Sequence, residues 1–393
     1  MMGHKSVQRG AVSIFIVIFT SLLVVVVTTG FIQIMLRNQQ QASNNDLSQS
    51  AYDSAMAGVE DAKRALVRLK ECSRVGVTGP DCDALRTAYV VSNGQDCQSL
   101  EAAGANFQGS KKEVMVGAEQ LNQAYTCVTV QVKTHEYEGA LRNQLPNVIP
   151  LVPDEDSNTL THVRVSWFVR DNLPDGDDGA MVIPPSVDLP LYGAWRDDTP
   201  PIIRAQLIQF DGNSPINLSS FSSAGTSNAK SVFLYPSNIS AALSFKNDGR
   251  RSAGSRNDPQ RVRCENTFDT TIYACSATIE LPDPVGQREA YLQLAGIYNK
   301  SVTNYKVELC RSAACPPTDV IDFDNVQPIV DATGRASDLF RRVRARVSVT
   351  GAGTPLEFPE ASLSVNGNVC KDFSITNAPA DYKATTDIIA CEP

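Results

Sequence analysis

AVSIFIVIFTSLLVVVVTTGFIQIML, residues 11–36, contains no Asp, Glu, Lys or Arg and lies between Arg9 and Arg37. A helix of about 26 residues is ~39 Å long at 1.5 Å per residue, and the hydrocarbon core of a bilayer is ~30 Å thick. The polar side chains of the stretch are all uncharged and can bond within the helix or to a neighbouring helix: Ser13, Thr20, Ser21, Thr28, Thr29 and Gln33. The stretch therefore predicts a transmembrane helix.

The residues before this stretch predict its orientation. Residues 1–10, MMGHKSVQRG, are polar and carry Lys5 and Arg9. The positive-inside rule keeps this end in the cytoplasm and places everything after Arg37 across the membrane. A secretory signal has a shorter apolar core followed by a small-residue cleavage site, and none follows Leu36.

The chain after Arg37 is typical of an amphipathic helix. Apolar residues recur there at steps of three or four and so share one helical face: Leu47, Ala51, Ala55, Val59, Ala62, Leu66 and Leu69. Together with the apolar stretch they predict one helix over residues 11–70, ~90 Å long. A plain membrane anchor followed by a solvated spacer helix is the simpler alternative.

This N-terminal region resembles a type IV prepilin, and in detail the PilX-type minor pilins. The resemblance rests on the junction Arg9-Gly10-Ala11 after a short basic leader and on the stretch AGVEDAK, Ala57–Lys63, and it covers residues 8–70. It implies that a prepilin peptidase cleaves after Gly10 and methylates Ala11. It also implies that the helix assembles with those of other pilin subunits. The chain departs from the family at the fifth mature position, where most pilins carry Glu and this chain has Phe15.

Length and composition describe a folded protein with a large region outside the membrane. The chain has 393 residues, 42% hydrophobic and 20% charged, with a net charge of −8. That charge argues against a nucleic-acid-binding surface over the ectodomain, so no nucleic acid partner is expected. A local basic patch is conceivable in one strand-like stretch, although a solvated sheet face explains it more simply: Arg341, Arg342, Arg344 and Arg346.

The ten cysteines all follow the apolar stretch. An even number of cysteines in an exported region favours disulfides, and two histidines beyond the leader give little support to a zinc site. Neighbours along the chain suggest local pairing, although sequence cannot fix connectivity: Cys72–Cys82, Cys97–Cys127, Cys264–Cys275, Cys310–Cys315 and Cys370–Cys391. The last pair would close a C-terminal loop.

The remaining chain predicts an α+β fold, with the long N-terminal helix packed on a large, mainly antiparallel β-rich ectodomain. Residues 71–150 are a mixed segment of loops and strands, with a short helix candidate at Asp83–Tyr89 and a first strand at Tyr125–Val132. Residues 151–393 form the β-rich region. Residues 145–158, with three prolines, predict a linker or surface loop. Ala336–Phe340 is a short helix candidate. The later strands are expected at Thr161–Val169, Ile202–Phe210, Ser231–Tyr235, Ala241–Phe245, Thr271–Leu281, Ala290–Tyr298, Asn304–Leu309, Val343–Thr350 and Ser362–Val365.

Catalytic motifs are absent from the sequence. There is no G-x-S-x-G, H-E-x-x-H, G-x-x-x-x-G-K-[ST] or G-x-G-x-x-G. A Ser–His–Asp or Cys–His site outside the leader would need His135 or His162, and both lie at predicted strand ends. The sequence therefore predicts a protein that is not an enzyme.

The acidic loop DGDDG is the best candidate for a metal site. Asp175, Asp177 and Asp178 alternate beside glycine and could wrap a Ca²⁺ ion, but a solvated turn is the default and no cofactor is otherwise expected. Weaker acidic segments are Asp154–Asp156 and Asp322–Asp324. Aromatic residues in strands could form a binding surface, although core packing is the better expectation: Trp167, Phe168, Tyr192, Trp195 and Tyr235.

Three functions remain open. The first is a minor pilin at the tip of a type IV pilus, acting in assembly and adhesion. The second is a tip pseudopilin of a type II secretion system, and the third is a membrane-anchored surface adhesin outside any filament. The first two begin in the cytoplasmic membrane as single-pass proteins with the N-terminus inside, and the minor pilin then reaches the cell surface.

Overall fold

The computed structural model describes residues 10–72, 77–92, 98–108, 113–116, 122–142, 146–154, 159–173, 179–180, 182–183, 193, 195–210, 229–238, 259–269, 273–283 and 289–349. The chain divides into two compact units. Unit 1 consists of Met1–Gln131 and Ile329–Arg346, and unit 2 of Val132–Pro328 and Val347–Pro393. The fold is α+β, as expected.

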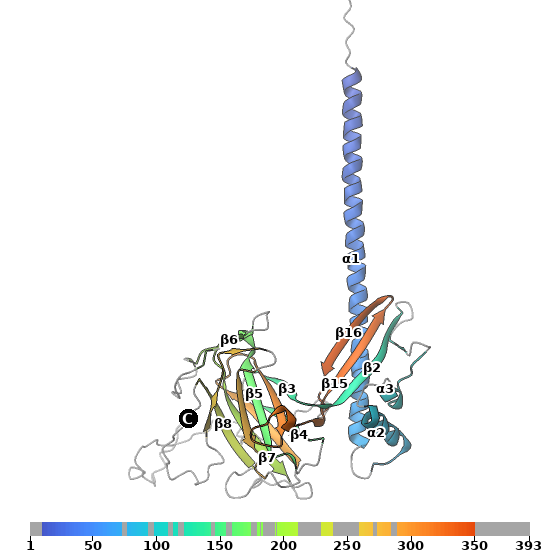
Figure 1. The fold of residues 1–393 in the computed structure, drawn as a ribbon. Helices are drawn as coiled ribbons and strands as arrows, with labels where there is room; N and C mark the ends of the chain where they lie inside the picture. The colour runs from blue at the N-terminus through green and yellow to red at the C-terminus, as the bar shows by residue number, and fades with distance from the viewer. Residues whose placement is uncertain are drawn as a thin grey trace, which may run out of the picture. The chain divides into compact units, whose positions relative to one another are not determined.

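Helix α1 is a single element of 63 residues, Gly10–Cys72 (Figure 1). It contains no proline, which explains why it continues unbroken from the apolar stretch into the amphipathic one. Its side chains from residue 14 to residue 46 are almost all exposed. From Ala51 onward one face is buried, and its members match the predicted stripe except that Leu47 is only half-buried: Ala51, Ala55, Val59, Ala62, Leu66 and Leu69.

A four-stranded sheet completes the core of unit 1 in the order β1-β2-β15-β16. Its strands are β1 (Val114–Met115), β2 (Gln123–Thr134), β15 (Phe323–Ala336) and β16 (Leu339–Arg346). The β1/β2 and β15/β16 pairs are antiparallel. Residues of β15 and β16 thus join a sheet whose first strands lie more than 180 residues earlier in the sequence, and α1 packs on β16.

Two short helices follow α1 in unit 1. Helix α2 (Pro80–Ser92) begins with a proline, which is favoured at the first helical position, and α3 (Gln98–Ala102) lies against it. The Cys72–Cys82 disulfide joins the last residue of α1 to the first turn of α2. Leu85, Tyr89 and Leu100 are buried. The short helix expected at Asp83–Tyr89 is confirmed as part of the longer α2, whereas α3 was not expected.

Unit 2 is a sandwich of two five-stranded sheets that share one hydrophobic core. One sheet has the order β11-β5-β13-β14 with β3 also paired to β13, and the other has the order β4-β12-β7-β8-β9. All described pairs are antiparallel except β8 with β9. The strands are β3 (Tyr137–Leu141), β4 (Asn147–Leu151), β5 (His162–Val169), β7 (Ile202–Phe210), β8 (Ala229–Ser237), β9 (Pro259–Arg263), β11 (Cys275–Glu280), β12 (Glu289–Ile297), β13 (Thr303–Cys310) and β14 (Val320–Ile321).

A disulfide and a short strand pair reinforce this sandwich. Cys264 follows β9 and is bonded to Cys275 at the start of β11, so this bond joins edge strands of the two sheets. Strands β6 (Gly179–Ala180) and β10 (Thr267–Phe268) pair beside it.

Three expectations from the sequence are wrong. The helix candidate Ala336–Phe340 is the end of β15, a two-residue turn and the start of β16. Part of the proline-rich loop at 145–158 is strand β4, where Pro150 is tolerated because β4 lies at a sheet edge. The strand expected at Val343–Thr350 ends at Arg346.

The expected division at residues 150 and 151 falls inside unit 2. Local composition could not indicate that residues 329–346 return to unit 1, because this return depends on pairing between distant strands. The expected strands at Ala241–Phe245 and Ser362–Val365 lie outside the described residues.

Candidate functional site

The first half of α1 presents an apolar surface that no other described part of the chain covers. Every large apolar side chain from Ile14 to Leu36 is at least 49% exposed. This is the one helix of the described residues that is long and apolar enough to cross a membrane. Folding of the described residues does not bury this surface, which is suited to contact with lipid or with another protein.

The described hydroxyl groups in this half are satisfied within the helix. Four side chains donate hydrogen bonds of 2.7 to 2.9 Å to carbonyl oxygens three or four residues earlier: Thr20, Ser21, Thr28 and Thr29. Such bonds remove the need for water, because an unsatisfied polar group in hydrocarbon costs several kcal/mol. The helix surface is therefore suited to an environment without water.

Gly10, Ala11 and Phe15 lie in the first two turns of α1. The Phe15 side chain is 73% exposed, like its apolar neighbours. The cleavage between Gly10 and Ala11 that the prepilin resemblance implies stays a prediction, as does the role of Phe15 in assembly.

Contacts with the sheet of unit 1 hold the second half of α1. The Tyr125 hydroxyl of β2 donates a 2.7 Å hydrogen bond to the Asp61 carboxylate. Burial raises the pKa of the Tyr125 phenol, and Asp61 raises it further, so the hydroxyl keeps its proton and remains a donor. On β15, Gly334 packs directly against the α1 backbone at Ala51 and Ala55. The free half of α1 is therefore a rigid continuation of a helix anchored in a folded unit.

Three of the five expected local cysteine pairs are disulfides in the structure: Cys72–Cys82, Cys264–Cys275 and Cys310–Cys315. The Cys127 side chain and the whole of Cys97, Cys370 and Cys391 lie outside the described residues. The three bonds close short loops at the ends of helices and strands, where they limit the freedom of the unfolded chain.

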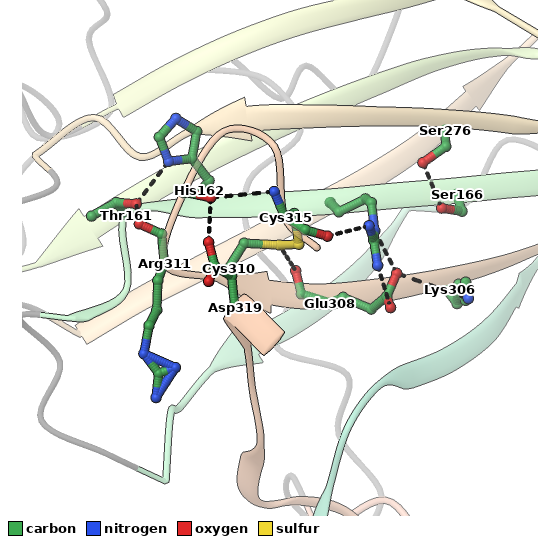
Figure 2. Close-up of a disulfide and its surroundings, with 12 residues drawn as sticks. Thr161, His162, Ser166, Ser276, Lys306, Glu308, Cys310, Arg311, Cys315 and Asp319 are labelled. Carbon is green, nitrogen blue, oxygen red and sulfur yellow. Dashed lines mark hydrogen bonds and ion pairs between the residues drawn. A yellow bond between two sulfur atoms is a disulfide. The ribbon is translucent and has the colours of Figure 1, made fainter. Parts of the chain in front are cut away.

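The Cys310–Cys315 turn at the end of β13 is held by a network of polar contacts (Figure 2). The Thr161 hydroxyl donates to the Arg311 carbonyl at 2.7 Å, and the Ser312 hydroxyl donates to the Asp319 carboxylate at 2.6 Å. Arg164 of β5 donates to the Cys315 carbonyl at 2.6 Å.

Arg164 also forms a two-bond ion pair with Glu308, with both nitrogen–oxygen distances 2.7 Å. Glu308 is nearly buried, with a side chain 9% exposed. Sequence reasoning missed this pair because its members lie 144 residues apart and each sits in an ordinary strand pattern. The pair and the disulfide together make the turn rigid.

Of the three acidic segments that the sequence singles out as candidate metal sites, the structure describes parts of two. Asp175, Asp177 and Asp178 lie outside the described residues, so their calcium site stays a prediction. The two weaker segments come together in unit 2, where the Asp154 amide donates to the Asp322 carbonyl at 2.8 Å.

A lysine occupies this second cluster. The Lys133 ammonium lies 2.6 Å from Asp154, and this hydrogen bond raises the pKa of Lys133. Burial raises the pKa of the Asp324 carboxyl, and the charge of Asp154 raises it further. Among the described residues, no group of three His, Cys, Asp or Glu side chains is placed to hold a metal ion. The cation that lies beside these carboxylates is the Lys133 ammonium of the chain itself.

Both histidines outside the leader have structural partners. His135 pairs with Asp322 at the surface. The His162 ring lies 2.7 Å from the Thr161 hydroxyl, which itself donates to Arg311, so the His162 Nδ1–H is the donor in this contact. The hydroxyl beside His162 is thus engaged with the Cys310–Cys315 turn.

Four of the five candidate aromatic residues are described, and all four pack in the core. Trp167 is fully buried, and Phe168, Trp195 and Tyr235 are at most 4% exposed. Trp195 stacks on Tyr298 with ring centroids 4.9 Å apart. Tyr192 lies outside the described residues.

Comparison with known proteins gives no relative: no family model matches this chain, and no curated protein matches it.

Proposed function

We propose that this chain is a membrane-anchored, pilin-like structural subunit that joins a type IV pilus-type filament through α1. One observation carries the proposal: a single helix, Gly10–Cys72, combines an exposed apolar half with a half that packs on an antiparallel sheet. An anchor joined to its domain by a flexible spacer needs no such continuity. A subunit that must hold its domain at a defined angle to the helical core of a filament does need this continuity of the helix.

The apolar half would first lie in the cytoplasmic membrane and later against the helices of neighbouring subunits. Both environments exclude water, and the hydroxyl groups of this half are already satisfied within the helix. Three disulfides in the described ectodomain fit an oxidising compartment outside the cytoplasm. Lys5 and Arg9 would keep the leader inside, where a prepilin peptidase would cut after Gly10.

The proposed role is structural, and Phe15 supports a position at the filament tip. In pilins the carboxylate at the fifth mature position is thought to neutralise the amino terminus of a neighbouring subunit. Phe15 has no charge to offer, so this chain cannot neutralise another subunit in that way. A terminal, low-copy position agrees with this difference, and adhesion through the exposed ectodomain would follow from it.

The test is the N-terminus of the mature chain. Surface filaments are sheared from cells, and mass spectrometry determines whether the chain is present and begins at Ala11. Gly10→Leu should leave the precursor uncut in the membrane, whereas Gly3→Leu, a glycine change elsewhere in the leader, should mature normally.

Two results would contradict the proposal. A filament-free chain that retains residues 1–10 would favour the anchored adhesin. A chain cut at Ala11 that affects protein export and is absent from sheared pili would favour the pseudopilin of a secretion system.

A further inference from the structure

The hairpin of β15 and β16 joins the sheet of unit 1 from a distant part of the sequence. Strand β15 lies beside β2 in this sheet, although Val132–Pro328 of unit 2 separates the parts of the two strands that belong to unit 1. The Thr126 hydroxyl of β2 donates a 3.1 Å hydrogen bond to the Thr333 carbonyl of β15, 207 residues away. The packing of α1 is therefore completed by a segment that follows Val132–Pro328 in the chain.

Strand β15 contributes buried residues to both units. Its first half, which belongs to unit 2, supplies Phe323 and Val326 to the core of the sandwich. In its second half Gly334 faces α1, so the alternation of side chains puts Ala332 and Ala336 on the same face. Both alanines are fully buried. One continuous strand thus takes part in the packing of each unit.

Side-chain contacts within unit 2 hold the first half of β15 against the segment that follows β2. The Gln327 side chain accepts a 2.9 Å hydrogen bond from the Glu138 amide and donates a 2.7 Å bond to the Glu138 carbonyl. Gln327 is only 8% exposed, so water competes little for these bonds. Nearby in the sequence, His135 pairs with Asp322. We call these two contacts, Gln327–Glu138 and His135–Asp322, the strand clasp.

The strand clasp reduces the entropic cost of docking the hairpin. Without it, pairing of β15 with β2 would close a loop of about 200 residues, and the cost of loop closure rises with loop length. The clasp joins Glu138 to Gln327, which lie near the two ends of this loop. It therefore raises the effective concentration of the hairpin beside β2.

We propose that the strand clasp couples the folding of unit 2 to the anchoring of α1. While the clasp is closed, β15 and β16 stay docked and cover the apolar stripe of α1. When it opens, the hairpin can leave α1 while Phe323 and Val326 stay in the sandwich, because local opening needs less free energy than global unfolding. A chain whose unit 2 has not folded has no clasp and leaves this stripe exposed.

The test measures hydrogen exchange of the full chain in phosphatidylcholine nanodiscs. Gln327→Ala removes both bonds to Glu138 and should raise the exchange of the α1 amides between Ala51 and Leu69 about tenfold. These amides respond because an amphipathic helix draws most of its stability from the packing of its apolar face. The amides of β12, an inner strand of the sandwich, report the stability of unit 2 itself.

Gln209→Ala is the matched control. Gln209 is also buried in unit 2, and its side chain holds the backbone of Asp283 with the same two kinds of bond, at 3.0 Å and 2.6 Å. Its loss leaves the clasp intact, so we expect α1 exchange as in the wild type and a change at β12 similar to that in Gln327→Ala. If Gln327→Ala does not fold, Gln327→Met, which has a similar volume and makes neither bond, takes its place.

Two results would overturn the proposal. The first is equal α1 exchange in the Gln327 and Gln209 variants, whether raised in both or unchanged in both. The second is a rise in α1 exchange in the Gln327 variant that only matches the rise at β12, because α1 would then be released by unfolding of the whole of unit 2. The proposal does not depend on the filament role, since the exchange is measured on the isolated chain.

Discussion

Gly334 of β15 lies so close to the Ala51 carbonyl of α1 that a Cβ atom at position 334 would overlap this oxygen and the Ala55 amide nitrogen. Backbone meets backbone here, and neither side can yield as a flexible side chain would. This contact, together with the Tyr125–Asp61 hydrogen bond, joins the long helix to its sheet.

Gly334→Ala should therefore destabilise unit 1 by about 1–3 kcal/mol, because the added methyl group forces the strand away from the helix. Hydrogen exchange of the α1 amides between Ala51 and Leu69 measures the loss. Gly193→Ala is the control, since a Cβ there meets nothing within 4 Å. Equal protection of the α1 amides in the Gly334→Ala variant and the wild type would show that β15 can accommodate a methyl group at position 334 without moving away from α1.

The Arg164–Glu308 pair tests whether the Cys310–Cys315 turn depends on a nearly buried charge. Glu308→Gln leaves the Arg164 guanidinium without its carboxylate, and breaking such a pair costs about 3–5 kcal/mol when both groups are shielded. Arg164 is 23% exposed, so we expect the lower end of this range in a urea unfolding experiment. Asp198→Asn, which breaks the exposed Arg196–Asp198 pair, should cost less than about 1 kcal/mol.

Replacing both members of the pair with Leu provides the complementary measurement. The double variant should be closer to the wild type than Glu308→Gln, because the Arg164 charge is removed together with its carboxylate, whereas Lys306, 3.9 Å from Glu308, loses this carboxylate in both variants. The matched single variants are Arg164→Leu and Glu308→Leu. A double variant whose loss of stability equals the sum of these two losses would show that the two residues do not act together.

The sequence predicts best where one physical rule decides the outcome. The apolar stretch and the buried stripe of α1 follow from helical periodicity, and the structure has both in one helix. Strands with clear period-two patterns, such as β5 and β7, also lie where expected.

What was missed depends on partners distant in sequence. Strand β15 contains Pro328 and Gly334, which locally disfavour a strand, yet Gly334 is needed where the backbone meets α1. The cluster of Lys133, Asp154 and Asp322 was only partly predictable from the sequence. The acidic segments stand out, but nothing in the sequence indicates that Lys133 lies between them.

His162 should make the stability of unit 2 depend on pH. Burial lowers the pKa of His162 below its ordinary value, so the unfolded state binds more protons than the folded state just below pH ~6.5. Stability should therefore fall as the pH drops through this range and stay level for this group above it. Unfolding midpoints between pH 5 and 8 measure the effect for the wild type and His162→Gln.

The difference between the two profiles isolates His162. Asp324 has a raised pKa and acts in the opposite direction, favouring the folded state as the pH falls, but it is present in both proteins. His135→Gln, at the exposed histidine, is the matched control. Parallel profiles for the wild type and His162→Gln would contradict the prediction.

Phe15 leads to the last prediction, which concerns position in the proposed filament. A carboxylate in an apolar helix core costs several kcal/mol unless it is paired, so a subunit with no neighbouring amino terminus to neutralise is better served by an apolar residue. Immunogold labels on the ectodomain should accordingly appear singly at filament ends. Phe15→Glu introduces the carboxylate that most pilins carry at this position and should allow labels along the shaft. Phe19→Glu places the same charge one turn further along α1, where no amine is available, and should prevent assembly. Regular labelling of the wild type along the shaft would exclude the tip position, because such subunits would assemble without the neutralising carboxylate.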